Sequence, residues 1–193
     1  MITGCHIITK NAVNIFNIRQ KQLALSHLGV ERYGIIGLFI LTPAHTANKA
    51  LIAEHGNEIF QAAHQNGVDV AFEAAVAGGI PILKSLGEGL AANHINWVAG
   101  IINGTGNYIL TEMEQGGRAF QEVLEEAQSL GYAEADPTFD VEGVDAAHKL
   151  TIIASIAFGI PLQFSKVYME GISRITIEDV KSAAQFGYRI KHL

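Results

Sequence analysis

The chain has 193 residues, of which 49% are hydrophobic and 17% charged, and its formal net charge is −6. This composition is that of a globular protein with enough chain for one core or for parts of two. The acidic balance argues against a nucleic-acid partner, because no basic cluster with interleaved aromatic residues offers a footprint for a phosphate backbone.

A membrane partner and an export signal are not expected either. The longest apolar run, Tyr33–Thr42, is too short to span a bilayer, and Met1–Lys10 lacks the form of a signal peptide. The single cysteine, Cys5, excludes an internal disulfide and fits a reducing compartment. The expected location is therefore the cytoplasm.

The first predicted elements form a helix, strand and turn unit of α/β type. Residues 46–67 (TANKALIAEHGNEIFQAAHQNG) predict two helical pieces interrupted at Gly56. Residues 68–74 (VDVAFEA) predict an apolar strand that leads to a turn at Gly78 and Gly79.

The next part of the chain is predicted to contain a helix and a second strand. The helix should run from Ile80 to Leu90, with Pro81 near its first turn. The apolar residues 95–103 (INWVAGIIN) predict a buried strand, which ends at the turn residues of Asn103-Gly104-Thr105.

Three further amphipathic helices are predicted, over Asn107–Gln115, Ala119–Leu130 and Thr176–Phe186. In the second of them one face is apolar and the other carries glutamates. The apolar residues are Phe120, Val123, Leu124, Ala127 and Leu130.

Residues 134–149 (EADPTFDVEGVDAAHK) are the most informative segment, because they combine five carboxylates with a lysine. Turn residues place the acids before Gly143 on a loop, and Val144 begins a helix. Asp145 and Lys149 are then neighbours at positions i and i+4. No charged residue lies between Lys149 and Lys166, so the helix should be largely buried beyond its first turn.

Spacing alone leaves two interpretations of the Asp145–Lys149 pair. It is either a solvated bridge worth about 0.3–0.5 kcal/mol near a helix N-terminus, or part of a reactive site. The apolar residues that follow favour the site, because a lysine at the edge of a core can serve as a proton carrier.

Several ordered motifs resemble those of the homoserine dehydrogenase family. They are TANKALIAEHG, AFEAAVAGGIPILKSL, GIINGTGNYILTEM, EADPTFDVEGVDAAHKLTIIASIAFG and GISRITIEDVKSAAQFGYRIKHL. The resemblance covers residues 46–193, whereas residues 1–45 do not resemble the family and stay unassigned.

The resemblance implies an α/β fold in two parts. Residues 46–75 would be the C-terminal part of a Rossmann-type nucleotide-binding domain. Residues 76–193 would be an α+β substrate and dimerisation domain, with a sheet covered by helices, that stops before its last strands. A homodimer is implied as well.

The implied reaction interconverts aspartate 4-semialdehyde and homoserine with NADP or NAD, in the biosynthesis of threonine, methionine and isoleucine. Lys149 matches the acid/base lysine, and Asp145 would hold the lysine and substrate in register. Glu134 matches an acid that binds the substrate amino group. Tyr132, Gly104 and Thr105 match positions that shape the pocket.

One position departs from the family within that pocket. Where the family has threonine or another side chain, this chain has Gly106. We expect the glycine to loosen the loop without removing a catalytic group.

The resemblance also assigns residues in the first part of the chain. Lys49 matches a lysine near the nicotinamide, although without the resemblance an exposed helix lysine is the better interpretation. The turn EAAVAGGI matches a sodium site formed mainly by backbone oxygens, at Glu73, Val76, Gly78 and Ile80. On spacing alone, a tight turn without an ion is the better interpretation. The eight histidines lack the spacing of a transition-metal site.

The phosphate-binding turn of a Rossmann domain needs a G-x-G-x-x-G spacing, and Gly34 and Gly37 do not provide it. Two functions therefore remain open. One is an oxidoreductase acting on a small-molecule substrate. The other is a catalytically inert fragment that retains only a folding and oligomerisation module.

Overall fold

A computed structural model describes residues 44–193 of the chain. The apolar run Tyr33–Thr42, Cys5, and Gly34 and Gly37 lie outside the described residues, so the predictions made from them stay predictions. Within the described part, no helix is both long and apolar enough to cross a membrane.

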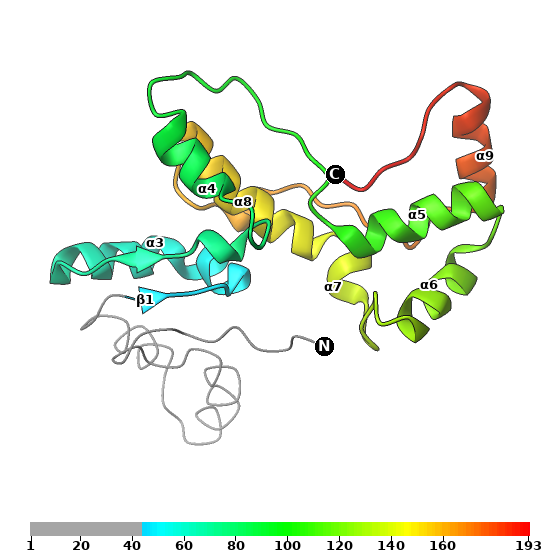
Figure 1. Cartoon of the computed structure of the whole chain (residues 1–193), viewed down its shortest axis with the longest axis horizontal. Coiled ribbons are helices and arrows are strands. Elements are labelled where there is room, and N and C mark those ends of the chain that lie inside the picture. Colours follow the sequence, from blue (N-terminus) through cyan, green and yellow to red (C-terminus); the bar gives the residue numbers. More distant parts are fainter. Residues whose placement is uncertain (1–43) are drawn as a thin grey trace. The chain divides into compact units, whose positions relative to one another are not determined.

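The chain divides into two compact units (Figure 1). The described part of the first unit comprises residues 44–94 together with Thr151–Gln163, and the second comprises Ile95–Leu150 together with Phe164–Leu193. Helix α8 (Val144–Phe158) supplies its first turns to the second unit and its remainder to the first. The expected division between residues 75 and 76 stays a prediction.

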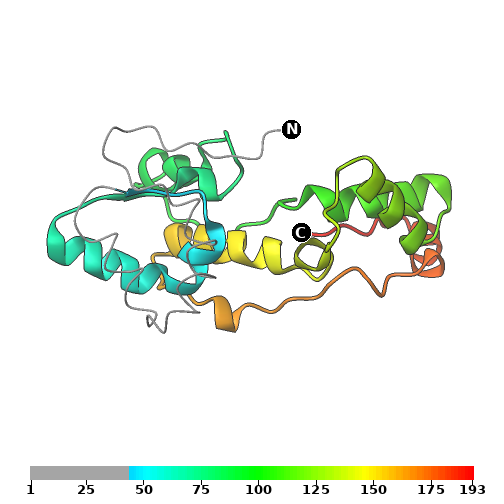
Figure 2. The ribbon, with the colours of Figure 1, turned by 90° about the horizontal axis from the view of Figure 1, so that it is seen from below.

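The first unit is built on a short parallel strand pair and the helix that joins its strands (Figure 2). β1 (Ala44–His45) pairs with β2 (Val70–Ala71), with Ala44 opposite Val70. Between them lies α3 (Lys49–Asn66), which Asn48 caps by accepting a hydrogen bond from the Leu51 amide. Two parallel strands joined by a helix form a βαβ unit, as expected of an α/β fold.

The predicted interruption at Gly56 is wrong, because α3 is continuous through it. Gly56 is buried, and a Cβ added there would lie 2.3 Å from Cδ1 of Leu162. The backbone of Leu162 is fixed in turn by Asn57, whose side chain donates to the Leu162 carbonyl at 2.8 Å and accepts from its amide at 3.0 Å. The glycine therefore allows close packing and does not break the helix.

A reversal of the chain follows β2. The 3₁₀ turn η1 (Glu73–Ala75) leads to Ala77 and Gly78, which have left-handed φ angles of 57° and 58°. The predicted helix over residues 80–90 is present in two pieces, α4 (Ile82–Lys84) and the π-helical turn η2 (Ser85–Gly89).

The second unit is a cluster of helices around α5 (Gly104–Gly116). α5 contacts α6 (Phe120–Ser129), α7 (Thr138–Val141) and α9 (Ile177–Gln185), as Figure 1 shows. The buried core of this unit is formed by Ile109, Leu110, Met113, Val123, Leu124, Ala127, Ala133, Val141, Ile172 and Val180. The remaining element is the 3₁₀ turn η3 (Phe164–Lys166).

The three amphipathic helices predicted in this unit are confirmed. On α6, Val123, Leu124 and Ala127 are buried, Phe120 packs partly against the core and Leu130 is exposed. α9 begins with a capping box in which Thr176 and Asp179 satisfy each other's backbone amides. These amide and hydroxyl donors lower the pKa of Asp179.

Other predictions for the second unit are wrong. Residues 95–103 form no strand, because their backbone groups pair with neither β1 nor β2, and Trp97 and Ile101 are exposed. The only sheet of the described residues is the β1–β2 pair, so residues 76–193 lack the expected covered sheet. α7 lies within the predicted loop. Beyond its first turn α8 is buried or half-buried as predicted, except at Leu150 and Phe158, which are exposed.

Candidate functional site

Lys149 and Asp145 form an ion pair on one face of α8, as their spacing predicts. The Lys149 ammonium donates to Asp145 Oδ2 at 2.6 Å and to the Ile102 carbonyl oxygen at 2.7 Å. Only 19% of the lysine side chain and 9% of the aspartate side chain are exposed. The pair is therefore not a solvated surface bridge, since both partners have lost most of their contact with water.

Asn103 joins this pair to a second carboxylate. It caps α5, with its Oδ1 accepting from the Gly106 amide at 2.7 Å. Its Nδ2 donates to Asp145 Oδ2 at 2.9 Å and to Asp140 Oδ1 at 2.7 Å. One buried amide thus fixes the start of α5 and bridges two acids.

In the resulting network the donors are the Asn103 amide nitrogen and the Lys149 ammonium, and their acceptors include the carboxylates of Asp140 and Asp145. Asp145 Oδ2 accepts from an ammonium and from an amide, which is the environment of an ionised carboxylate. The ammonium of Lys149 has three N–H donors, of which Asp145 and Ile102 use two among the described residues. The third N–H donor has no hydrogen-bond partner among residues 44–193.

The predicted pocket residues Thr105 and Tyr132 lie together. The Thr105 hydroxyl donates to the Tyr132 carbonyl oxygen at 2.9 Å. The Tyr132 ring is exposed and packs edge-to-face against Tyr108, with 5.1 Å between the ring centroids. Gly104 is the exposed first residue of α5.

Glu134 is exposed, and the hydrogen bonds of the Asn103 network described above do not include it. Its carbonyl oxygen accepts from Gln128 Nε2 at 3.1 Å. Convergence of its carboxylate with Lys149 therefore stays a prediction.

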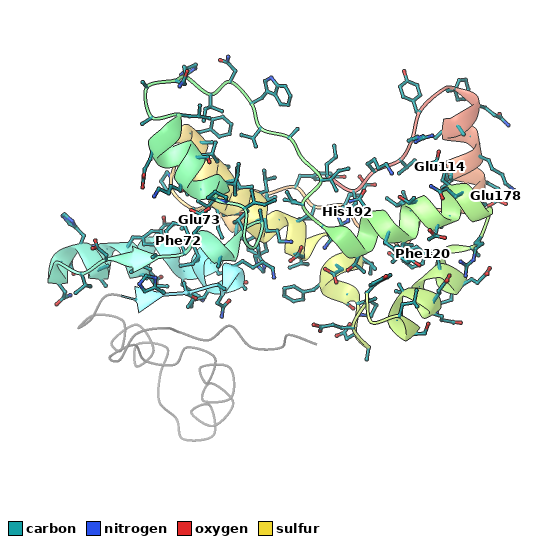
Figure 3. All side chains as sticks on the ribbon, in the orientation of Figure 1. Phe72, Glu73, Glu114, Phe120, Glu178 and His192 are labelled. Carbon is teal, nitrogen blue, oxygen red and sulfur yellow. The ribbon has the colours of Figure 1, made fainter. Side chains whose placement is uncertain are left out.

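His192 is a buried residue beside this network that the sequence analysis missed; Figure 3 shows it near the start of α5. Its amide donates to Asn107 Oδ1 at 3.0 Å, and Asn107 Nδ2 donates to its carbonyl oxygen at 2.6 Å. Burial lowers the pKa of His192, and the charges of Asp145 and Asp140 oppose that shift.

The expectation that Gly106 loosens the loop is wrong. Gly106 is buried in the first turn of α5, where Asn103 holds its amide. A Cβ at this position would lie 2.5 Å from Nδ1 of His192. The imidazole therefore occupies the space that a side chain at position 106 would need.

The remaining predicted residues belong to the first unit. Lys49 is the half-buried first residue of α3. The Glu73 carboxylate, labelled in Figure 3, accepts from the Leu83 amide at 2.9 Å and the Lys84 amide at 2.8 Å, so it serves as a cap for α4. Val76 is buried and Ile80 is exposed.

Residues 44–193 contain no group of three histidine, cysteine, aspartate or glutamate side chains placed to hold a metal ion. A sodium site formed by main-chain oxygens at residues 73, 76, 78 and 80 stays a prediction. With its carboxylate engaged by two amides, Glu73 would contribute its carbonyl oxygen.

Local spacing could find Lys149 and Asp145 but not their partners. The sequence predicts only a turn at Asn103, although an asparagine before Gly-Thr is also a typical helix N-cap. Asp140 was one acid among five, and nothing in its own neighbourhood indicates that Asn103, 37 residues earlier, reaches it.

Comparison with known proteins identifies relatives for most of the chain. The family model described as homoserine dehydrogenase matches residues 81–193. The homoserine dehydrogenases of Pseudomonas aeruginosa and Neisseria gonorrhoeae are 74% and 64% identical over 148 residues, which cover 77% of this chain and 34% of each relative. The chain therefore spans about a third of the length of these curated relatives.

Solved structures give the same result. A homoserine dehydrogenase from Thiobacillus denitrificans matches with a TM-score of 0.76 and 67% identity, over 77% of this chain and 35% of that one. A hyperthermophilic archaeal homoserine dehydrogenase in complex with NADPH matches with a TM-score of 0.64 and 31% identity, over 72% and 42%.

Proposed function

Because this chain belongs to the homoserine dehydrogenase family, we propose that it carries the substrate-handling residues of an oxidoreductase that interconverts aspartate 4-semialdehyde and homoserine. This reaction serves the biosynthesis of threonine, methionine and isoleucine. The single observation that supports the proposal most directly is the Lys149 ammonium, which Asp145 and Ile102 hold while its third N–H donor has no partner within the described part of the chain.

Lys149 is the proposed acid/base. During reduction its remaining N–H bonds the aldehyde oxygen and gives up a proton as charge develops there, and in the reverse direction the neutral amine takes the proton of the homoserine hydroxyl. Asp145 holds the amine in one position through its hydrogen bond to Lys149, and Asn103 fixes Asp145 in turn by donating to the same carboxylate oxygen. A fixed donor costs no reorganisation at the moment of reaction.

Glu134 and the residues around it are the proposed binding groups for the amino-acid part of the substrate. The exposed carboxylate of Glu134 would pair with the substrate ammonium. Tyr132, Gly104 and Thr105 would shape the pocket, supported by the hydrogen bond from Thr105 to the Tyr132 backbone.

A nicotinamide dinucleotide, NADP or NAD, would supply hydride to this reaction. The described residues do not fit its pyrophosphate, because they hold no G-x-G-x-x-G turn. Only Lys49 is proposed to act near the cofactor. The other proposed site residues of this chain bind the substrate and transfer the proton.

We also propose the assignments that accompany this function. Residues 46–75 belong to a nucleotide-binding domain and residues 76–193 to a substrate and dimerisation domain. The protein assembles as a homodimer through the second of these domains. A structural sodium ion is proposed at the main-chain oxygens of Glu73, Val76, Gly78 and Ile80. The left-handed turn at Ala77 and Gly78 supports it, because it redirects consecutive carbonyl groups.

A second candidate function is an inert module that folds and oligomerises without turnover. The observation in its favour is the missing glycine turn among residues 44–193. Homoserine binding and dinucleotide binding, measured separately on the chain by calorimetry, distinguish the two candidates. An inert module binds neither.

The role of Lys149 is tested by steady-state kinetics of Lys149→Met in a protein that supplies a complete nucleotide-binding half alongside these residues. We expect turnover to fall about 10²–10⁴-fold, the usual contribution of a positioned acid or base, with little change in dinucleotide affinity. Lys166→Met is the matched control, since Lys166 is exposed on η3. Unchanged turnover in Lys149→Met would make the lysine a purely structural partner of Asp145.

Glu134→Ala tests the substrate side independently of hydride transfer. Its loss should raise the Michaelis constant for homoserine, or weaken calorimetric homoserine binding, much more than it affects the dinucleotide. Glu125→Ala, an exposed acid on α6, is the control. Equal homoserine affinity in the two variants contradicts the assignment of Glu134.

A further inference from the structure

The imidazole of His192 lies between two glycines, Gly106 in the first turn of α5 and Gly143 directly before α8. A Cβ at Gly106, in the first turn of α5, would lie 2.5 Å from Nδ1. A Cβ at Gly143, directly before α8, would lie 3.4 Å from Nε2. The ring therefore fills the space between the start of α5 and the start of α8, both within the second unit.

The main chain of His192 is fixed to the same helix. Two hydrogen bonds join its amide and carbonyl to the side chain of Asn107. Asn107 Nδ2 also donates to the Asn103 carbonyl oxygen at 2.9 Å. His192 is thus linked through one side chain to the residue whose amide bridges Asp140 and Asp145.

The ring acts by its volume and not by its hydrogen bonds. Nδ1 is buried and has no hydrogen-bond partner among the described residues. Burial lowers the pKa of the ring, so the neutral form persists near neutral pH despite the charges of Asp145 and Asp140. A neutral ring without a hydrogen bond at Nδ1 contributes buried contact area and keeps the start of α5 at a fixed distance from the start of α8.

We propose that His192 is a positioning residue of the Lys149 site. Its ring sets the separation between the starts of α5 and α8 at which Asn103 can bond Asp145, and thereby holds the lysine amine in place. The catalytic consequence rests on the function proposed above, whereas the spacing role stands independently of it.

The spacing role is tested by amide hydrogen exchange. The Gly106 amide bonds Asn103 Oδ1 and reports directly on the network. His192→Ala should lose protection at Gly106 selectively, with α6 amides unchanged, and His192→Phe should retain it because the ring volume is kept. His94→Ala, an exposed histidine, is the control. Uniform loss of protection across α5 and α6 would reduce His192 to a general packing residue and overturn the proposal.

A double-mutant cycle between positions 106 and 192 tests the same contact from both sides. Gly106→Ala should lower the melting temperature when the imidazole is present, because the added methyl group meets Nδ1. In the His192→Ala background the contacts with the imidazole are gone and only the 3.2 Å approach to Asn103 Oδ1 remains, so the effect of the same methyl group should become much smaller. Additive effects of the two substitutions contradict the proposal.

Kinetics separate the positioning role from the proposed function. His192→Ala should lower kcat about 10- to 100-fold with little change in the Michaelis constant for homoserine, because displacement of a catalytic group by about 1 Å costs that much. His192→Phe should restore kcat. These kinetics are measured in a protein that supplies a complete nucleotide-binding half alongside these residues. If neither the unaltered sequence nor any variant turns over homoserine there, the proposed function fails, while the exchange and coupling measurements still decide the positioning role.

Discussion

Oδ2 of Asp145 accepts two hydrogen bonds, one from Lys149 and one from Asn103. Asp145 is 6% exposed. Removal of one partner from a buried ion pair leaves the other charge desolvated without compensation. The same chain provides a comparison, because Lys84 and Glu88 also form an i, i+4 pair, at 3.8 Å and with both side chains mostly exposed.

Replacement of the acid should lower the free energy of unfolding by very different amounts in the buried Asp145–Lys149 pair and in the exposed Lys84–Glu88 pair. We expect Asp145→Ala to lower the free energy of unfolding by about 2–4 kcal/mol, because Lys149 keeps some access to water. Glu88→Ala should change it by less than about 0.5 kcal/mol. Urea denaturation of both variants measures the difference, and equal values would show that the Asp145 pair is as weakly coupled as a surface bridge.

His192 should make stability depend on pH on the acid side of neutrality. Its pKa is lowered in the folded state, so the unfolded chain binds a proton more readily and stability is lost as pH falls below the unfolded value of about 6.5. The free energy of unfolding should therefore drop between neutral pH and pH 5. His192→Phe should remove this part of the dependence, and an identical pH profile in that variant would contradict it.

At the scale of elements, close packing decides where glycine is required. Gly56 lies inside α3, a position at which alanine favours a helix by about 1 kcal/mol on propensity alone. Leu162 opposes this gain, since its backbone is fixed by Asn57 and its side chain already occupies the space next to Gly56.

Gly56→Ala should therefore be destabilising, by about 1–2 kcal/mol after the propensity gain is subtracted. In a Leu162→Ala background the methyl group has room, and the same substitution should become stabilising. Thermal unfolding of the four variants tests the change of sign. A stabilising Gly56→Ala in the unaltered background would mean that Leu162 can rotate away at little cost.

Elements with local signals were predictable, and elements that depend on distant partners were not. The starts of α8 and α9 follow from turn residues and a capping box within a few positions. The same holds for the Asp145–Lys149 pair, which helical geometry alone brings together. In contrast, residues 95–103 have the composition of a strand but do not pair with β1 or β2, the strands of the described residues.

The site repeats this division between local and distant information. Asn103 reaches Asp145 across 42 positions, and Asn107 reaches His192 across 85. Neither separation has a periodicity that a single sequence could reveal. The first turn of α5 has a glycine at position 106, whose amide bonds the Asn103 cap. The reason for this glycine is evident only from the structure, in which the His192 imidazole occupies the space of a side chain at that position.

At the scale of the molecule, α8 is the element common to both compact units. Residues 144–150 belong to the second unit and Thr151–Phe158 to the first. A disruption in its middle should therefore affect residues of both units, whereas a disruption of α3 affects the first unit only.

Leu150→Pro tests this sharing. Proline removes a hydrogen bond and clashes with the preceding turn, which costs about 3 kcal/mol or more. Amides of α3 and of α5 should both lose protection against hydrogen exchange. Glu58→Pro, an exposed site in α3, is the matched control and should leave α5 protected. Protection of α5 in both variants would show that the second unit folds without α8.

Trp97 is the single tryptophan of the chain, and 74% of it is exposed in the folded protein. Its fluorescence therefore starts from a water-like emission maximum, so unfolding of the chain should shift the spectrum very little. A protein or ligand that covers residues 95–101 would instead move the emission to shorter wavelength and shield the indole from soluble quenchers. The fluorescence of Trp97 should therefore report the binding of a partner to this segment and change very little when the chain unfolds.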